Sequence, residues 1–139
     1  GLGDVYKRQR QLSEHGLRVA LADERGEVAA VYDRVPQFDL GPRTDVMTGG
    51  SKAACCMMLL RAMNPQVLAF DEITTPEDIA AIEVAAGCGV QLLATAHAFS
   101  PQTLRQRGLY RRLLDDGIFR RAVCIRLENG ARRYEVEAL

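Results

Sequence analysis

Three short apolar runs, each followed by polar or ionisable residues, constrain the fold of this chain most strongly. They span residues 19–22, 67–70 and 90–94. Runs of this length, bounded by charges and turn formers, are typical of strands that are buried on both faces. Because segments with helical signals separate them, we expect an α/β fold, a mainly parallel sheet with helices on both faces.

Start and stop signals locate the helices between these strands. Ser51 is suited to cap a helix over residues 51–63, and Asn64-Pro65 ends it. Thr75 followed by Pro76 is the start signal of a second helix. The same reasoning predicts helices over 76–86, from 100 onward and over 109–116, and a last helical turn over 12–16.

The remaining segments carry turn signals. Residues 26–50 have an irregular pattern, which predicts a functional loop or small hairpins. Near the C-terminal end, Asn129-Gly130 separates two strand candidates and predicts a hairpin of residues 122–127 and 133–136.

Composition fits one globular domain and narrows the class of protein. The chain has 139 residues, zero net charge and 47% hydrophobic residues, which excludes a disordered chain. Its longest apolar run, residues 53–60, is far shorter than a membrane-spanning helix requires. The four cysteines form no C-x-x-C pair, so we expect reduced, buried thiols and a cytoplasmic protein. Balanced charge also makes nucleic acid an unlikely partner, although residues 105–121 are locally basic.

Candidate functional residues follow the three strands. In an open parallel sheet, ligands bind beyond the carboxyl ends of the strands. Asp71 could hold Mg²⁺ through water, while Glu72 orients and deprotonates an attacking water. The alternative is an ordinary surface turn that begins with two acids. The other two strand ends favour function, because they deliver Asp23-Glu24 and Thr95-Ala96-His97 to the same edge.

The chain lacks the phosphate loop that this chemistry requires. The pattern G-x-x-x-x-G-K-[ST], whose amides and lysine hold phosphates, does not occur. A related set of residue types in the wrong order follows a polar loop, and we interpret it as a helix cap: Gly49-Gly50-Ser51-Lys52.

Several stretches together resemble the stage III sporulation protein AA ATPase family. They are residues 19–29, 41–46, 60–73 and 93–98, and the resemblance covers nearly everything after Gln9. The family is similar to secretion-type ATPases, which are P-loop motors that form hexamers. Membership implies a P-loop NTPase (RecA-like) core, ATP and Mg²⁺ as cofactors, a homo-oligomeric ring, and membrane proteins of a sporulation channel complex as partners.

The resemblance also implies roles for particular residues. Asp71 and Glu72 would be the Walker B pair, and Glu24 the acidic-box carboxylate near the γ-phosphate. His97 would be the histidine-box residue, with Thr95 beside it at the same strand end. The bland alternative for His97 is a side chain that merely satisfies a turn.

Two features depart from the family pattern. The family's phosphate loop lies immediately before the helix that ends here near Leu12, where this chain has Gly1–Gln9. We therefore expect residues 1–9 to be a non-native segment and 10–139 a truncated ATPase domain, missing the first strand and phosphate loop and inactive as it stands. Thr74-Thr75 also stands where secretion ATPases often have an arginine.

Arg43 and Arg61 are candidates to reach the nucleotide of a neighbouring subunit as arginine fingers. The alternative, a solvated charge or a surface ion pair, is the more common role of an arginine.

The resulting expectation is an ATP-hydrolysing motor unit of a sporulation-associated secretion or channel complex, cytoplasmic or peripheral at the membrane. One alternative is a non-catalytic oligomeric assembly module that docks through the apolar helix 51–63. Another is a nucleic-acid-dependent RecA-type ATPase, which is supported only by the arginine-rich segment 105–121.

Overall fold

The computed structural model describes residues 2–139, which form two compact units. Unit 1 extends to His97, and unit 2 comprises Ala98–Leu139. The candidate residues that follow the three apolar runs all belong to unit 1.

Unit 1 is built on a four-stranded parallel sheet. Its strands are β1 (Val19–Ala22), β4 (Thr44–Met47), β5 (Val67–Phe70) and β6 (Gln91–Leu93), in the order β4-β1-β5-β6. All neighbouring pairs in this sheet are parallel. The three expected strands are therefore present and adjacent, and the expected α/β class is confirmed.

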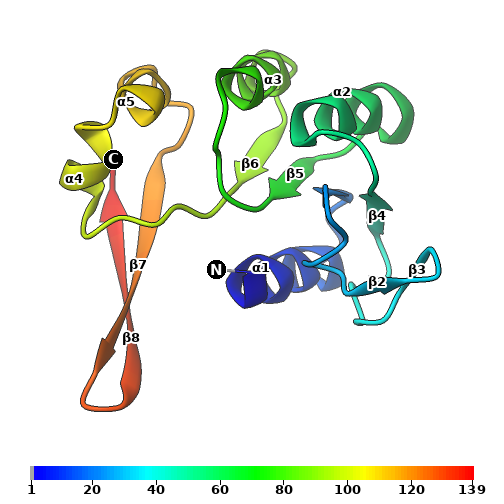
Figure 1. Cartoon of the computed structure of the whole chain (residues 1–139), viewed down its shortest axis with the longest axis horizontal. Helices are drawn as coiled ribbons and strands as arrows, with labels where there is room; N and C mark the ends of the chain where they lie inside the picture. The colour runs from blue at the N-terminus through cyan, green and yellow to red at the C-terminus, as the bar shows by residue number, and fades with distance from the viewer. Residues whose placement is uncertain (1) are drawn as a thin grey trace. The chain divides into compact units, whose positions relative to one another are not determined.

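Helices cover both faces of this sheet. Figure 1 shows α1 (Leu2–Glu14) on one side and α2 (Lys52–Met63) and α3 (Pro76–Gly87) on the other. Contacts of α1 with β1, β4 and β5, and of α2 with α3, β1 and β4, agree with this arrangement. The expected layering, with helices on both faces, is confirmed.

Side chains along each strand alternate between the two faces of the sheet, so the core has two parts, one on each face. Val19 and Leu21 of β1 join Val67 and Ala69 of β5 in a buried cluster that also contains Val5 of α1. Successive strand residues point to opposite faces, so the intervening residues face the layer of α2 and α3. These residues are completely buried: Ala20, Ala22, Leu68 and Phe70. Both faces of β1 and β5 are therefore core, which explains why their sequences are apolar at every position.

Cap chemistry fixes the starts of two helices, as the sequence predicts. Ser51 Oγ accepts a hydrogen bond from the Ala54 amide at 3.2 Å and caps α2. Thr75 and Asp78 form a reciprocal capping box at the start of α3, with Pro76 in the first turn. These side chains satisfy amides that have no partner within the helix.

The segment between β1 and α2 contains more regular structure than the sequence suggests. It includes a small hairpin of β2 (Val31–Tyr32) and β3 (Val35–Pro36), as expected, but also β4, which was not predicted. β4 is polar enough to resemble a loop, because it lies at the edge of the sheet and none of its residues is fully buried. Pairing with β1 holds it in place.

The first helix is longer than the single last turn that the sequence indicates. It begins at Leu2, so residues 2–9 are helical. Its buried positions, Val5, Gln9 and Ser13, recur every four residues, and two of them are polar. That polar composition hides the apolar period in the sequence.

Gly41 allows α1 to approach the segment that precedes β4. Its φ is +87°, and a Cβ there would lie 2.7 Å from Ser13 Oγ. Ser13 Oγ in turn accepts a hydrogen bond from the Arg43 amide at 2.7 Å. A glycine is needed here for both its backbone conformation and its lack of a side chain.

Unit 2 contains two short helices and a two-stranded ribbon. They are α4 (Pro101–Arg105), α5 (Gly108–Asp115), β7 (Arg121–Glu128) and β8 (Ala131–Ala138). β7 and β8 are antiparallel, and Asn129 and Gly130 between them both have positive φ. Two such residues are typical of a tight hairpin turn, so the predicted hairpin is confirmed.

The cysteines are all free thiols, but they are not all buried. Cys55 and Cys56 of α2 are buried, whereas Cys124 is half-buried and Cys88 is exposed at the end of α3. The expectation of burial is therefore wrong for Cys88, because it follows the last turn of its helix. Burial raises the pKa of Cys56 to about 12, and Asp78 adds to the shift, so this thiol stays protonated and unreactive near neutral pH.

Within residues 2–139, no helix combines the length and the apolar character needed to cross a membrane.

Candidate functional site

The carboxyl edge of the sheet gathers the predicted residues. Because β1, β5 and β6 are parallel, their last residues lie at one edge, with Ala22 opposite Phe70. Asp23 and Asp71 directly follow these two paired residues. The predicted convergence of strand ends at one edge is thus present in the structure.

Asp71 is paired with a buried lysine. Its Oδ1 lies 2.9 Å from Lys52 Nζ, and the lysine side chain is only 6% exposed, against 28% for Asp71. Oδ1 is itself buried and has no aligned hydrogen-bond donor among the described residues, so the contact is an ion pair rather than a directed hydrogen bond. Asp71 therefore connects the buried Lys52 ammonium with the partly exposed surface of the site.

The same lysine contacts two further acceptors. Lys52 Nζ donates to the backbone carbonyl of Glu72, and it lies 3.9 Å from Asp78 Oδ2. Asp78 Oδ2 also accepts hydrogen bonds from the amides of Thr74 and Thr75, each at 3.0 Å. The turn that carries Glu72 is thus fixed on both sides, by α2 through Lys52 and by α3 through Asp78.

Asp23 has a structural role. It is almost completely buried, and its two carboxylate oxygens accept hydrogen bonds from the amides of Val28 and Ala29 at 3.1 and 2.9 Å. Those contacts shape the turn after β1. The next residue, Glu24, is exposed. Of the two acids after β1, Glu24 is thus the one whose side chain is exposed.

Thr95 and His97 lie two residues apart on the segment that follows β6. Thr95 is half-buried and His97 is exposed. Both follow a strand that pairs with β5, so they belong to the same edge as Asp71.

The two candidate arginines lie toward the opposite edge of the sheet. The carbonyl of Arg43 accepts a hydrogen bond from the Val19 amide, where β1 begins, and Arg61 is in the last turn of α2, which leads to the start of β5. Both side chains are exposed. The backbones of the two arginines are therefore at the edge of the sheet opposite to the one where Asp23 and Asp71 follow the strands.

The segment Gly49-Gly50-Ser51-Lys52 serves as a helix start. Ser51 caps α2, and Lys52 is turned toward carboxylates. The interpretation of Ser51 as a cap is confirmed. Lys52, by contrast, is not part of a polar helix face, because its side chain is buried.

Metal ligands at this edge are few. Among residues 2–139, no cluster of three or more histidine, cysteine or acidic side chains is arranged to hold a metal ion. Mg²⁺ is commonly bound by one or two carboxylates, with water and substrate phosphates completing the shell. Asp71 could supply one such carboxylate oxygen, Oδ2, because the Lys52 ammonium engages only Oδ1.

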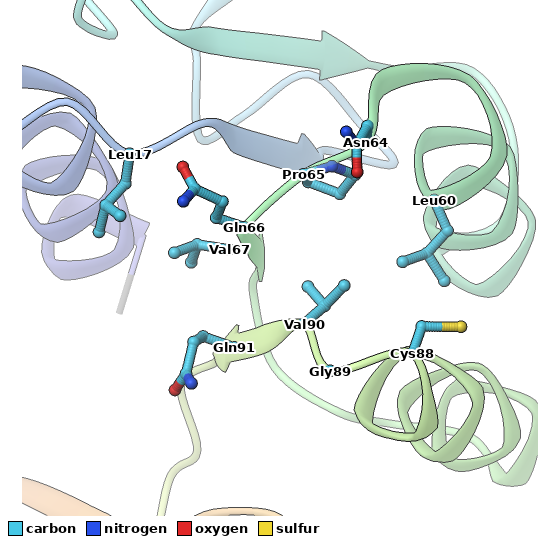
Figure 2. Close-up of a pocket in the computed structure, with 10 residues that line it drawn as sticks. All are labelled: Leu17, Leu60, Asn64, Pro65, Gln66, Val67, Cys88, Gly89, Val90 and Gln91. Atoms are coloured by element: carbon cyan, nitrogen blue, oxygen red, sulfur yellow. The ribbon is translucent and has the colours of Figure 1, made fainter.

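None of these carboxylates is among the residues that line a cavity of about 400 Å³, whose walls are drawn in Figure 2. It opens where β1, β5 and β6 begin, at the amino edge of the sheet. Its walls combine apolar side chains with amides: Leu17, Leu60, Asn64, Pro65, Gln66, Val67, Cys88, Gly89, Val90 and Gln91. In the part of the chain that the structure describes, no charged side chain lines it, so it offers no cation to a nucleotide phosphate.

The basic segment of unit 2 is partly neutralised by its own acids. Arg105 pairs with Asp115 at 2.5 Å, and Arg112 lies 3.8 Å from Asp116. These pairs lower the positive charge available to a nucleic acid.

Sequence reasoning missed two residues of this site. Lys52 was interpreted as part of a cap, and Asp78 was not among the candidate site residues. A signal existed for Lys52: it is one of two lysines among 18 basic residues, Lys7 being the other, and it begins an otherwise apolar helix. A charge in such a position often has a buried partner.

Comparison with known proteins gives the family. A model of the family described as "Sporulation stage III, protein AA" matches residues 8–136. "Stage III sporulation protein AA" of Bacillus subtilis (strain 168) is 35% identical over 105 residues, which are 76% of this chain and 34% of that relative. The chain thus spans about a third of the length of its curated relative, and no solved structure matches it. On this match, the chain belongs to the sporulation stage III protein AA family.

Proposed function

We propose that this chain is the carboxylate-bearing part of an ATP-hydrolysing motor with a P-loop NTPase (RecA-like) core. The observation that carries the proposal is the shared edge of β1, β5 and β6, where Asp71 and Glu72 follow one strand and other polar residues follow its neighbours. Open parallel sheets bind ligands at this edge. The family name adds the biological setting of sporulation.

The residues divide the chemistry between them. Asp71 would hold Mg²⁺ through a water molecule, and Glu72 would orient and deprotonate the attacking water. Glu24 is exposed beyond β1 and would stand near the γ-phosphate, with Thr95 and His97 on the other side of β5. When bound, Mg²⁺ supplies positive charge that offsets the charge of the phosphates.

The proposed core needs two elements that are not among the described ones: a first strand and a phosphate loop. β6 is the last strand in the described sheet and its residues are exposed or half-buried, whereas β1 and β5 are completely buried, so a further strand could pair with its outer edge. α1 leads into β1, and Ser13 near its C-terminal end contacts Arg43 at the amino edge. Its N-terminal end therefore lies toward the carboxyl edge, where a phosphate loop would join it.

Binding of Mg-ATP tests the part played by that loop. Residues 1–139 are expected to bind Mg-ATP weakly or not at all, because a phosphate loop supplies most contacts to the β- and γ-phosphates. Titration calorimetry with the 139-residue chain measures this, and the intact protein serves as the positive control. Micromolar affinity of the chain would contradict the prediction and would implicate residues 49–52.

In this proposal the motor of the intact protein is a homo-oligomeric, hexameric ring, which energises membrane proteins of a sporulation channel complex. Head-to-tail contacts in a ring bring one subunit's exposed arginines to the next subunit's nucleotide. The location of Arg43 and Arg61 toward the amino edge agrees with a role in trans.

Mixing two inactive variants tests the shared site. An Arg43→Ala or Arg61→Ala subunit mixed with a Glu72→Gln subunit is expected to recover part of the ATPase activity, because some interfaces then contain a working arginine and a working base. Steady-state hydrolysis by the mixed intact proteins measures the recovery. Monomeric sedimentation with ATP present, together with no recovery, would contradict the ring.

A non-catalytic assembly module is the second candidate, and α2 favours it. Met58 and Met63 on this helix are 54% and 44% exposed, so part of its apolar surface is available to a partner. The two candidates differ in one measurement: a Glu72→Gln protein that supports normal spore formation would favour the assembly module, whereas a motor requires the base.

A further inference from the structure

Lys52 forms the centre of a buried charge cluster at the candidate site. Its ammonium contacts Asp71 Oδ1 at 2.9 Å, the Glu72 carbonyl, and Asp78 Oδ2 at 3.9 Å. The lysine side chain and that of Asp78 are each only 6% exposed. The Glu72 carbonyl accepts a hydrogen bond from the ammonium, and the two carboxylates, one close and one farther away, supply the opposite charge.

These three oxygens come from two segments, and the lysine from a third. Lys52 begins α2, Asp71 and Glu72 form the turn after β5, and Asp78 is in the first turn of α3. One ammonium therefore links the starts of two helices to the turn that carries the proposed catalytic carboxylates. A long side chain is held this way only when the surrounding groups fix its rotamer and satisfy its charge.

The contacts of Lys52 restrict the orientations that Asp71 and Glu72 can adopt. The ion pair engages Asp71 Oδ1, which leaves Oδ2 as the oxygen for a cation at the partly exposed side of the residue. The bond to the Glu72 carbonyl fixes the backbone from which the Glu72 side chain extends. Misplacement of such groups by about 1 Å can reduce a rate by about 10²-fold.

We propose that Lys52 is the positioning residue of this site: its ammonium holds Asp71 in orientation for a divalent cation and fixes the backbone of Glu72, without touching phosphate itself. The inference rests on the proposed function, in which these two residues serve Mg²⁺ and water. It differs from the usual lysine of a phosphate loop, because the partners of Lys52 are carboxylates and a carbonyl.

The chain allows a direct test, because it has only two lysines. With ¹⁵N in the lysine ammonium groups, Lys52 is expected to give a slowly exchanging signal, whereas exposed Lys7 serves as an internal control that exchanges fast. Asp71→Asn is expected to shift the Lys52 signal and to speed its exchange by roughly tenfold, because a charged partner is lost. Asp78→Asn should have a smaller effect, since Asp78 is farther away.

Mn²⁺ then reports on the cation. Added Mn²⁺ is expected to broaden the Lys52 signal and to spare that of Lys7, and Asp71→Asn should abolish the broadening. A Lys52 signal that exchanges as fast as that of Lys7, or that ignores Asp71→Asn, would overturn the positioning role. A protected signal that responds to Asp71→Asn but not to Mn²⁺ would instead overturn the metal role in the proposed function and leave the Lys52 contact standing.

Kinetics of the intact protein separate positioning from simple stabilisation. Lys52→Gln is expected to lower kcat by roughly 10²-fold while the KM for ATP changes by less than about threefold, because Lys52 acts through groups that matter after binding. Lys52→Arg, which keeps the charge, should recover part of kcat. A Lys52→Gln protein with lowered thermal stability but unchanged kcat would show a structural role alone and overturn the inference.

Discussion

Replacing Glu72 by Gln in the intact protein is expected to reduce ATP hydrolysis by about 10²–10⁴-fold, the usual contribution of a single general base. The substitution keeps the size of the side chain and its backbone contact with Lys52, which involves the carbonyl. ATP binding should therefore persist while turnover falls. Steady-state phosphate release, together with equilibrium binding of ATP, measures both.

Glu77→Gln is the matched control for this experiment. Glu77 is an exposed acid in the first turn of α3, five residues along the same connection, and no strand end presents it to the site. Its replacement should leave turnover within about twofold, as for other surface substitutions of small energetic effect. Undiminished hydrolysis by Glu72→Gln would remove Glu72 from the mechanism.

Lys52→Met is expected to destabilise the chain by roughly 3 kcal/mol, which is at the low end of the cost of removing one partner from a buried ion pair. The low end applies because Asp71 remains 28% exposed and water can take over part of its charge. For a unit of the size of unit 1, which contains Lys52 and extends to His97, such a loss of stability lowers the melting temperature by roughly 10–20 °C. Chemical and thermal denaturation of the 139-residue chain measure the change.

Two further variants show whether unpaired charge causes the loss. Lys7→Met changes the same residue type on the exposed surface of α1 and should shift stability by less than about 0.5 kcal/mol. Adding Asp71→Asn to Lys52→Met should restore roughly 1 kcal/mol, because one stranded carboxylate is neutralised. A double variant no more stable than Lys52→Met would mean that lost packing, not charge, is responsible.

The buried part of the sheet was readable from the sequence, and the reason is its burial. β1 and β5 are core on both faces, so every residue in them is apolar and the predicted bounds, 19–22 and 67–70, match the structure. The caps of α2 and α3 were readable for a different reason: Ser51 and Thr75 act on amides only three residues away. Local capping interactions and complete burial of a strand can therefore both be recognised in a single sequence.

What the sequence did not reveal depends on contacts between distant segments. β4 is strand because β1 lies beside it, and its half-exposed residues carry no apolar run. Lys52 is buried because Asp71 and Asp78, from elements that follow in the chain, meet it across the layer. Neither partner lies within the helix that Lys52 begins, so local patterns could predict the cap but not the ion pair.

The central place of β1 in the sheet has a consequence for synthesis on the ribosome. β1 precedes the other described strands of the sheet in the chain, yet Val19 pairs with Thr44 and Val67, both of which emerge later. Parallel pairing at such separations closes long loops and is slow to form. While the nascent chain waits for β5, the described elements that can cover the four apolar residues of β1 are α1, β4 and α2, and the edge of β1 that pairs with β5 stays open to aggregation and to chaperones.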